Sequence, residues 1–203
     1  MNTGGAEKFA WDLAKLLAQK HKVSVIAFGK EHSFRQIDNV DVYFLKLVKH
    51  GLWYYLTFGK KSILNIFKIV KPDVVNSHMH NIITFVLRKQ KVKKILTLHN
   101  SRFEFYNKSS IDTLKFNLFN KNSFKHYEIS TVSNHMKEYL SKFLNKTVFH
   151  IPNGIDKSKF YLKEDLKRDP SILYVGRLEK FKGVDKIISL SKKLKSLKFK
   201  FIG

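Results

Sequence analysis

The sequence predicts an α/β protein in which a doubly wound parallel sheet is followed by the beginning of a second domain of the same kind. Two observations lead to this fold class. Short apolar segments of strand length alternate along the chain with segments whose apolar residues recur at helical spacing. A break at Pro152, Asn153 and Gly154 then separates this alternation from one further strand and helix.

The N-terminal region carries most of the alternation. Its first helix is expected from Ala6 to about Lys20, because apolar residues fall at helical spacing at Phe9, Leu13, Leu16 and Leu17. A helix at 62–70 is expected to end before Pro72, which disfavours helical backbone in the residue before it. Further strands are expected at 23–28, 42–47, 73–77, 95–98, 129–132 and 148–151, and further helices at 82–88, 111–124 and 134–144.

The C-terminal region begins after a polar connection at 156–169. It contains an expected strand from Ile172 to Val175 and a helix that begins near Val184. We therefore predict an N-terminal domain at 1–155, an interdomain connection at 156–169 and the start of a C-terminal domain at 170–203.

Composition limits the class of protein. The 203-residue chain is 43% hydrophobic, which is enough for one substantial core, and it has no apolar stretch of about 18 residues. It contains no cysteine, which excludes disulfides, thiolate zinc sites and thiol nucleophiles and fits a reducing cytosol. No secretory signal is visible at the N-terminus. These features predict a cytoplasmic globular protein without a membrane span.

The formal net charge of +23 raises the question of nucleic acid or an anionic membrane as a partner. Nearly all of the excess is lysine, spread along the chain, whereas readers of nucleic acid favour arginine. We therefore expect no nucleic acid, and the lysines could instead hold the protein against anionic lipid headgroups at about 1 kcal/mol each. The alternative is a basic nucleic-acid-binding protein without catalytic activity, for which 102–108 is the candidate segment because it mixes cations with aromatic residues.

The segment from Tyr174 to Gly183 is the strongest candidate for a site. It places two cations, Arg177 and Lys182, and two glycines in a turn between the expected strand and helix. A helix start offers unpaired N–H groups, arginine can donate two parallel hydrogen bonds to phosphate oxygens, and lysine adds a point charge. The segment predicts an anion site, most simply for a diphosphate; the alternative is a solvated basic turn.

A second glycine turn, Gly4 and Gly5, stands just ahead of the first helix. It matches neither the dinucleotide-binding pattern nor the P-loop pattern, and an ordinary loop is the alternative. No metal site is expected. The chain has no Asp-x-Asp pair, and the closely spaced histidines His78 and His80 lie on opposite sides of an extended segment without a neighbouring carboxylate.

Five segments follow one another in a characteristic order along the chain. They are Gly4 to Glu7, Leu96 to Asn100, Thr131 to Ser133, Ile151 to Asp156, and Gly176 to Leu178 with Lys182 and Gly183. In this order they resemble the family 4 (group 1) glycosyltransferases, which have the two-domain GT-B fold and use nucleotide sugars. The similarity covers nearly the whole chain, and its last two motifs are the most specific.

The resemblance implies a role for each candidate residue. Arg177 and Lys182 would hold the diphosphate of the donor, Gly4 and Gly5 would approach it from the opposite domain, and His99 would lie near the transferred sugar. Arg177, Lys182 and His99 are thus the catalytic candidates.

For the reaction, the resemblance implies hexosyl transfer with retention of configuration and without a metal or other cofactor. The donor would be a nucleotide-diphosphate sugar, and the acceptor a glycan or a lipid-linked sugar. The setting would be cell-surface polysaccharide or lipopolysaccharide biosynthesis, in the cytoplasm or at the inner face of the membrane. A segment with Trp53, Tyr54, Tyr55 and Phe58 could face a lipid-linked acceptor or form the buried side of a helix.

The sequence departs from the family pattern at both ends. The family has a strand before the Gly-Gly loop, in the centre of the first Rossmann-like sheet, and a pair of glutamates seven residues apart in the second domain. We therefore expect an acceptor-side domain without its first strand, a truncated donor-side domain, and little or no activity in the isolated chain.

Overall fold

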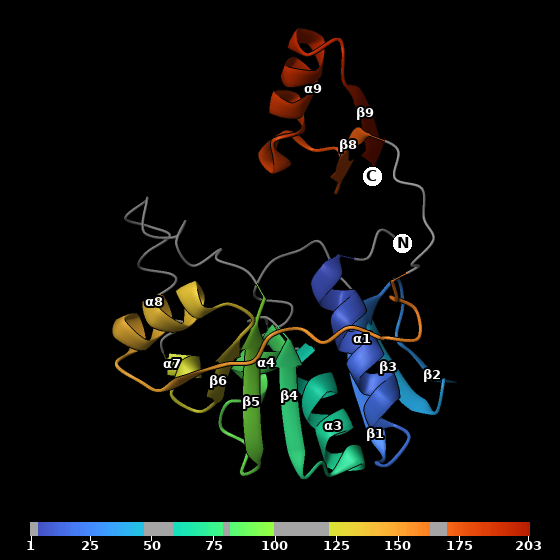
Figure 1. Cartoon of the computed structure of the whole chain (residues 1–203). Coiled ribbons are helices and arrows are strands. Elements are labelled where there is room, and N and C mark those ends of the chain that lie inside the picture. The colour runs from blue at the N-terminus through green and yellow to red at the C-terminus, as the bar shows by residue number, and fades with distance from the viewer. Residues whose placement is uncertain (1–3, 47–58, 79–81, 100–121, 163–169) are drawn as a thin grey trace. The chain divides into compact units, whose positions relative to one another are not determined.

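The computed structural model describes residues 4–46, 59–78, 82–99, 122–162 and 170–203 (Figure 1). The chain divides into two compact units, unit 1 (Met1–Gly154) and unit 2 (Ile155–Gly203). Their assignment as acceptor-side and donor-side domains stays a prediction. Outside the described residues lie His80, the cation-rich segment 102–108, the aromatic segment at 53–58 and most of the helix expected at 111–124.

The strands of unit 1 form two sheets. One contains β1 (Val23–Gly29), β3 (Val40–Lys46) and β2 (Ser33–Ile37) in the order β1-β3-β2, and the other is a parallel sheet in the order β4-β5-β6-β7. The strands of the second sheet are β4 (Val74–His78), β5 (Lys93–Leu98), β6 (Glu128–Thr131) and β7 (Val148–His150). In the described residues, no strand pairing joins β1 to β4. The predicted α/β fold with a parallel sheet is confirmed.

Strand β2 was not predicted, and it runs antiparallel to β3. Its residues are mostly polar and exposed, so the sequence carries no apolar pattern there. The turn before β3 consists of Asp38 and Asn39 with φ of 52° and 62°, between the paired residues Ile37 and Val40. Two consecutive positive-φ residues form the tight turn that suits the twist of a hairpin, and aspartate and asparagine tolerate it well.

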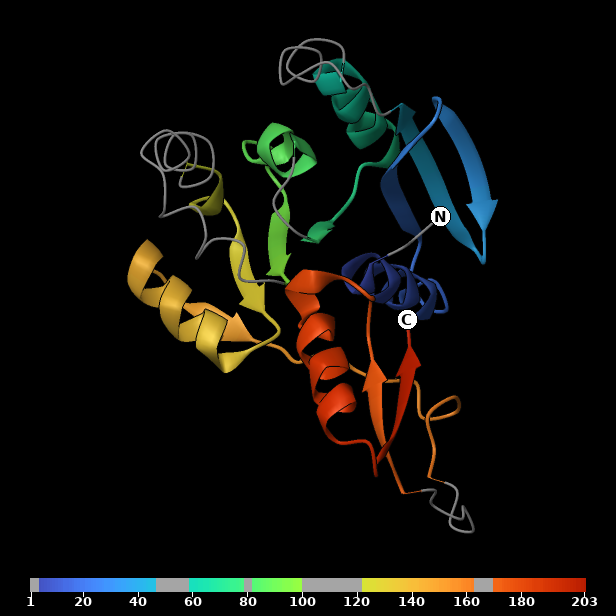
Figure 2. The ribbon, with the colours of Figure 1, turned by 90° about the horizontal axis from the view of Figure 1, so that it is seen from above.

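Helices cover both faces of these sheets, as a doubly wound arrangement requires (Figure 2). Helix α1 (Gly5–Leu17) packs Trp11 and Ala14 with Val40 and Val42 on one side. On the other side, α3 (Lys60–Val70) and α4 (Ile82–Leu87) form a cluster around Ile63 with strand residues such as Leu45. Helix α8 (Asn134–Leu144) is capped by Ser133, whose side chain accepts a hydrogen bond from the Met136 N–H, and the short α7 spans Asn122–Phe124.

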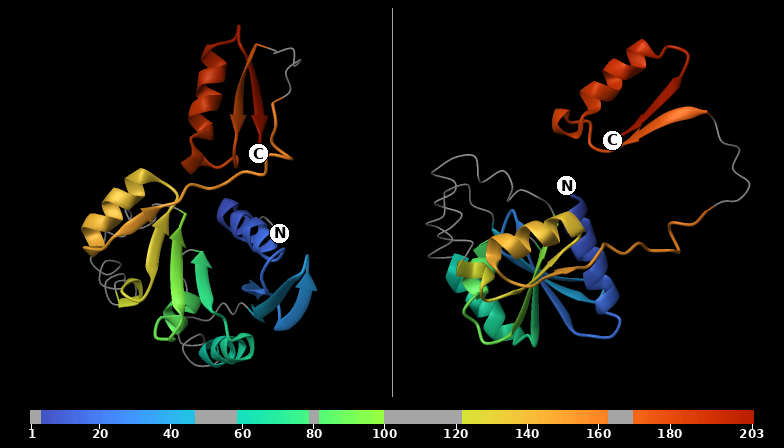
Figure 3. Two further views of the ribbon diagram at one scale, coloured as in Figure 1. Left: turned by 60° about the horizontal axis from the view of Figure 1, so that its bottom comes forward. Right: turned by 60° about the vertical axis from the view of Figure 1, so that its left-hand side comes forward.

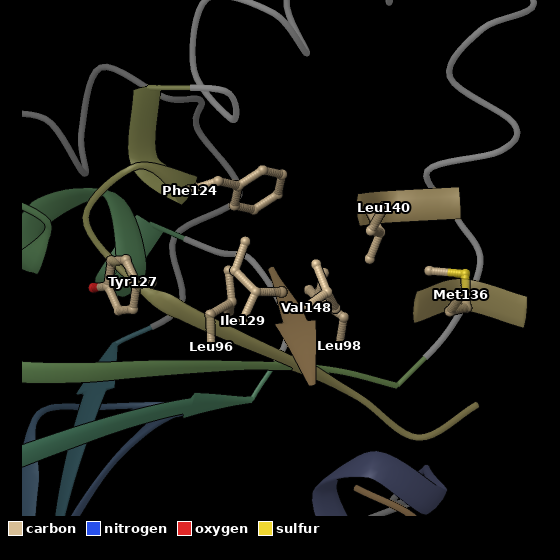
Figure 4. Packing of buried hydrophobic residues seen from close by; sticks show 8 residues of the cluster. All are labelled: Leu96, Leu98, Phe124, Tyr127, Ile129, Met136, Leu140 and Val148. Carbon is tan, nitrogen blue, oxygen red and sulfur yellow. The ribbon is translucent and has the colours of Figure 1, made fainter. Parts of the chain in front are cut away.

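The main apolar core lies between α8 and the parallel sheet (Figure 4). Its fully enclosed members include Leu96, Ile129 and Leu140, each 0% exposed. Tyr127 joins this core and its hydroxyl donates to the Thr84 carbonyl of α4 over 2.9 Å. Burial raises the pKa of this tyrosine to about 12. The phenol therefore ties α4 to the sheet as a neutral donor.

Unit 2 is a strand, a short turn, a helix and a second strand (Figure 3). β8 (Ser171–Val175) leads through the 3-10 turn η4 (Lys180–Lys182) into α9 (Val184–Lys193), and β9 (Lys198–Ile202) returns parallel to β8. β9 was not predicted as a strand. Of the described residues of unit 2, only Val184 is buried. Neither unit contains, in its described part, a helix long and apolar enough to cross a bilayer.

Candidate functional site

The basic turn of unit 2 is built on two glycines with positive φ. Gly176 follows β8 with a φ of 155°, and Gly183 has a φ of 76°. Gly183 closes η4, because its N–H bonds the Lys180 carbonyl over 2.9 Å, and it also stands at the N-terminal end of α9. A side chain in this left-handed region is strained, so glycine lets the chain stop one turn and start the next helix without steric strain.

Arg177 and Lys182 both lie against the ring of Phe181. The guanidinium carbon of Arg177 is 5.1 Å from the ring centroid, and Nζ of Lys182 is 5.5 Å from the same point. Both distances are within the range in which a cation is attracted to an aromatic ring. The structure thus brings the two predicted cations together at one exposed ring, with Phe181 69% exposed.

Glu179 is the residue in this turn that competes with a bound anion. Its carboxylate Oε1 lies 3.3 Å from Nη1 of Arg177, and both side chains are largely exposed. Exposed pairs of this kind contribute at most about 1 kcal/mol, so a dianionic ligand can displace the carboxylate at little cost. The Tyr174 hydroxyl donates to the Arg177 carbonyl over 3.0 Å and holds the backbone of the turn.

In unit 1, His99 follows directly after β5, and its side chain is paired with His78 at the end of β4. Nδ1 of His78 and Nε2 of His99 are 3.0 Å apart. Both strands are parallel and Thr97 is in register with His78, so their carboxyl ends meet at one edge of the sheet. Phe9 of α1 contacts both imidazoles edge to face, with centroid distances of 6.0 Å and 5.3 Å.

Both imidazoles are shifted toward their neutral forms. Burial, with a smaller contribution from the neighbouring His99, lowers the pKa of His78 from 6.5 to about 4. Burial also lowers the pKa of His99, and the carboxylate of Glu7 on α1 opposes this. At pH 7 the pair is therefore uncharged, and one ring nitrogen donates to the other.

The glycine turn at the start of α1 also forms. Gly4 is the N-terminal cap residue of α1, and a Cβ at this position would lie 2.6 Å from Oε2 of Glu7. The Glu7 side chain therefore folds back toward the cap, as an acidic residue three positions into a helix does in a capping box. A Cβ at Gly5 would meet nothing within 4 Å. Gly5 therefore faces open space. Its role in binding the donor diphosphate stays a prediction.

Sequence reasoning missed three features of these two sites: the His78 partner of His99, the Phe181 ring and the opposing Glu179. The sequence singles out His78 only as a candidate metal ligand. A usable signal existed, because His78 and His99 each stand at the carboxyl end of one of two consecutive parallel strands. Among the residues that the structure describes, no group of three or more histidines, cysteines or acidic residues is arranged to hold a metal ion.

The candidate residues thus form two sets, Arg177 and Lys182 in unit 2, and Gly4, Gly5 and His99 in unit 1. No curated protein shows significant similarity to the chain. A sequence model of glycosyltransferase family 4 matches residues 3–159, which include the glycine turn, both histidines and the whole parallel sheet. The chain, with its parallel sheet wound by helices and its histidine at the sheet's carboxyl edge, therefore belongs to glycosyltransferase family 4.

Proposed function

We propose that this family 4 chain binds a nucleotide-diphosphate sugar through Arg177 and Lys182. We further propose that it acts in the transfer of the donor's sugar to a glycan or lipid-linked acceptor. The observation that carries the donor site is the placement of both cations on the Phe181 ring, beside the glycine that opens α9. Arginine, lysine and a helix N-terminus are three of the groups that best bind a diphosphate.

The chemistry follows from where charge develops. The bond between the anomeric carbon and the diphosphate oxygen breaks, and its electron pair leaves with the nucleoside diphosphate. The acceptor hydroxyl oxygen bonds to the anomeric carbon on the same face, and its proton passes to the departing diphosphate. Fixed cations at the diphosphate gain interaction as this negative charge grows, so Arg177 and Lys182 stabilise the transition state more than the bound donor.

For unit 1 the proposal retains the roles that the resemblance implies, Gly4 and Gly5 at the donor phosphates and His99 at the transferred sugar. We propose that the transfer needs no metal ion, because Arg177 and Lys182 neutralise the negative charge of the leaving diphosphate. We also propose that the protein acts in the biosynthesis of cell-surface polysaccharide or lipopolysaccharide, and that its many lysines hold it near anionic lipid.

Titration calorimetry with uridine, guanosine and adenosine diphosphates tests the donor site. Arg177→Gln and Lys182→Gln should each weaken the best ligand about tenfold, because a charge-assisted hydrogen bond contributes about 1.5 kcal/mol or more. Lys192→Gln is the matched control, since it removes an exposed charge from the last turn of α9 in the same unit.

Two results would contradict the proposal. Equal weakening by Lys192→Gln would show that only net charge matters. Absence of nucleoside diphosphate binding, together with salt-dependent binding of mixed nucleic acid, would favour the nucleic-acid-binding alternative.

A further inference from the structure

We propose that His78 is a positioning residue that fixes the ring orientation and the tautomer of His99, so that the two histidines act as one hydrogen-bonded pair toward a neutral hydroxyl-bearing ligand. This inference rests on the proposed function for the identity of that ligand, the sugar of the donor.

The geometry of the two rings is the first argument. Their planes are inclined by 24° and their centroids are 5.3 Å apart, while the bridging nitrogens are 3.0 Å apart. The centroid distance exceeds the nitrogen distance by about the width of one imidazole ring. The two rings therefore meet edge to edge in nearly one plane, with the bridging nitrogens pointing at each other, which is the arrangement of a directed hydrogen bond.

The surroundings of the pair keep it in this arrangement. Thr97 Oγ1 donates to Asn76 Oδ1 over 3.3 Å and lies 3.0 Å from Ser130 Oγ, so these three side chains share one face of the sheet. His78 and His99 each lie two residues beyond a member of that row and therefore on the same face. Phe9 of α1 contacts both rings on this face and limits their rotation.

Proton counting shows what the pair can do. A neutral imidazole has one N–H and one acceptor nitrogen. If His78 donates through Nδ1, then His99 presents an N–H at its outer Nδ1 and His78 presents an acceptor at Nε2. If His99 donates instead, the two outer nitrogens exchange roles. In both cases the pair offers one donor and one acceptor outward.

An uncharged donor and acceptor suit a sugar hydroxyl, which can serve as both, and not a phosphate, which needs donors and positive charge.

The charged groups that act on the pair are few. Glu7 of α1 favours a proton on His99, and His99 disfavours a proton on His78. Two imidazolium rings at this separation would repel strongly, so the pair takes up at most one proton in the folded protein.

Three variants of His78 separate positioning from packing. His78→Phe keeps an aromatic ring for Phe9 to contact and removes the hydrogen bond. His78→Asn keeps an amide near the position of Nδ1, so it restores the bond, whereas His78→Gln carries its amide near the position of Nε2 and does not. If His78 only filled space, His78→Phe, which keeps a ring, would resemble the wild-type protein most, and His78→Asn and His78→Gln would resemble it less.

The first readout is the long-range ¹H–¹⁵N spectrum of the His99 ring nitrogens at pH 7, which needs no ligand. We expect one tautomer in the wild-type protein and in His78→Asn, and a mixture of tautomers in His78→Phe and His78→Gln. A single unchanged tautomer in His78→Phe would overturn the inference, whatever the protein binds.

The second readout is the affinity for uridine diphosphate glucose relative to uridine diphosphate, or for the corresponding pair of the best nucleotide. We expect His78→Phe to reduce the contribution of the sugar about tenfold and to leave the nucleoside diphosphate affinity unchanged. An unchanged ratio would overturn the inference, while failure of the wild-type protein to bind either ligand would count against the proposed function and leave the tautomer result to decide the role of His78.

Discussion

The strongest prediction about stability concerns the neutral state of His78. The pKa of this imidazole falls from 6.5 to about 4 in the folded protein, chiefly through burial. Between these values the unfolded chain binds a proton that the folded protein does not. The free energy of unfolding therefore falls as the pH is lowered from about 6.5 and stops falling below about 4.

The size of this loss follows from the pKa difference. Each tenfold change in proton affinity corresponds to about 1.4 kcal/mol, so the full difference would be worth about 3 kcal/mol. The imidazole is only half-buried, and solvent screening reduces the value, so we expect a loss of about 2 kcal/mol between pH 7 and pH 4. The variant His78→Phe lacks the titrating group and should not show this part of the loss.

Denaturant unfolding at a series of pH values, followed by tryptophan fluorescence to which Trp11 of α1 contributes, measures the effect. Other groups titrate in the same range, so the decisive quantity is the difference in slope between wild type and His78→Phe. His21→Phe, which removes an exposed imidazole instead, is the matched control. Parallel pH profiles for wild type and His78→Phe would refute the reasoning.

Three further predictions concern other parts of unit 1. Gly5→Ala should raise the free energy of unfolding by about 0.5 kcal/mol, because a Cβ there meets nothing within 4 Å. The same variant should weaken nucleoside diphosphate binding. An unchanged affinity in calorimetry would show that Gly5 is not part of the donor site. Leu140→Ala should destabilise the protein by about 2–5 kcal/mol in denaturant unfolding, since Leu140 is 0% exposed, whereas Leu16→Ala, at 62% exposure, should cost well under half of that. Tyr127→Phe should cost about 1–2 kcal/mol, since it leaves the Thr84 carbonyl without the phenol donor; a neutral result would mean that another donor replaces it.

The strands and helices that the sequence predicted best are those with a strong apolar pattern. The buried strands β5 and β6 and the amphipathic helices α1, α3 and α8 lie within a few residues of their expected positions. Strand β2 escaped prediction because its residues are exposed and mostly polar, whereas β9 has the alternation of lysine and apolar residues that is typical of a half-buried strand, a signal that the prediction did not use. Periodicity reports burial, so a strand that buries little gives little signal.

The candidate site divides in a similar way. In unit 2 the predicted turn between a strand and a helix is confirmed, because positive-φ positions and helix starts have local sequence signatures, whereas the role of its cations at a donor stays a prediction. The partners of those residues depend on tertiary packing. His78 and His99 are 21 positions apart, and only the parallel register of β4 and β5 makes them neighbours. The usable signal was therefore not a pattern within one segment but the position of both histidines at the carboxyl ends of two consecutive strands.

The separation of unit 1 into two sheets has a consequence for the chain in solution. In the part of unit 1 that the structure describes, β1 and β4 each have one side without a neighbouring strand, and α1 contacts both strands. Unpaired backbone donors and acceptors along a strand are a template for adding another chain. Mutual repulsion at a net charge of +23 opposes such growth, and added salt weakens that repulsion. Purification at low ionic strength should therefore keep the protein monomeric, and raising the salt should promote assembly through these open strand edges.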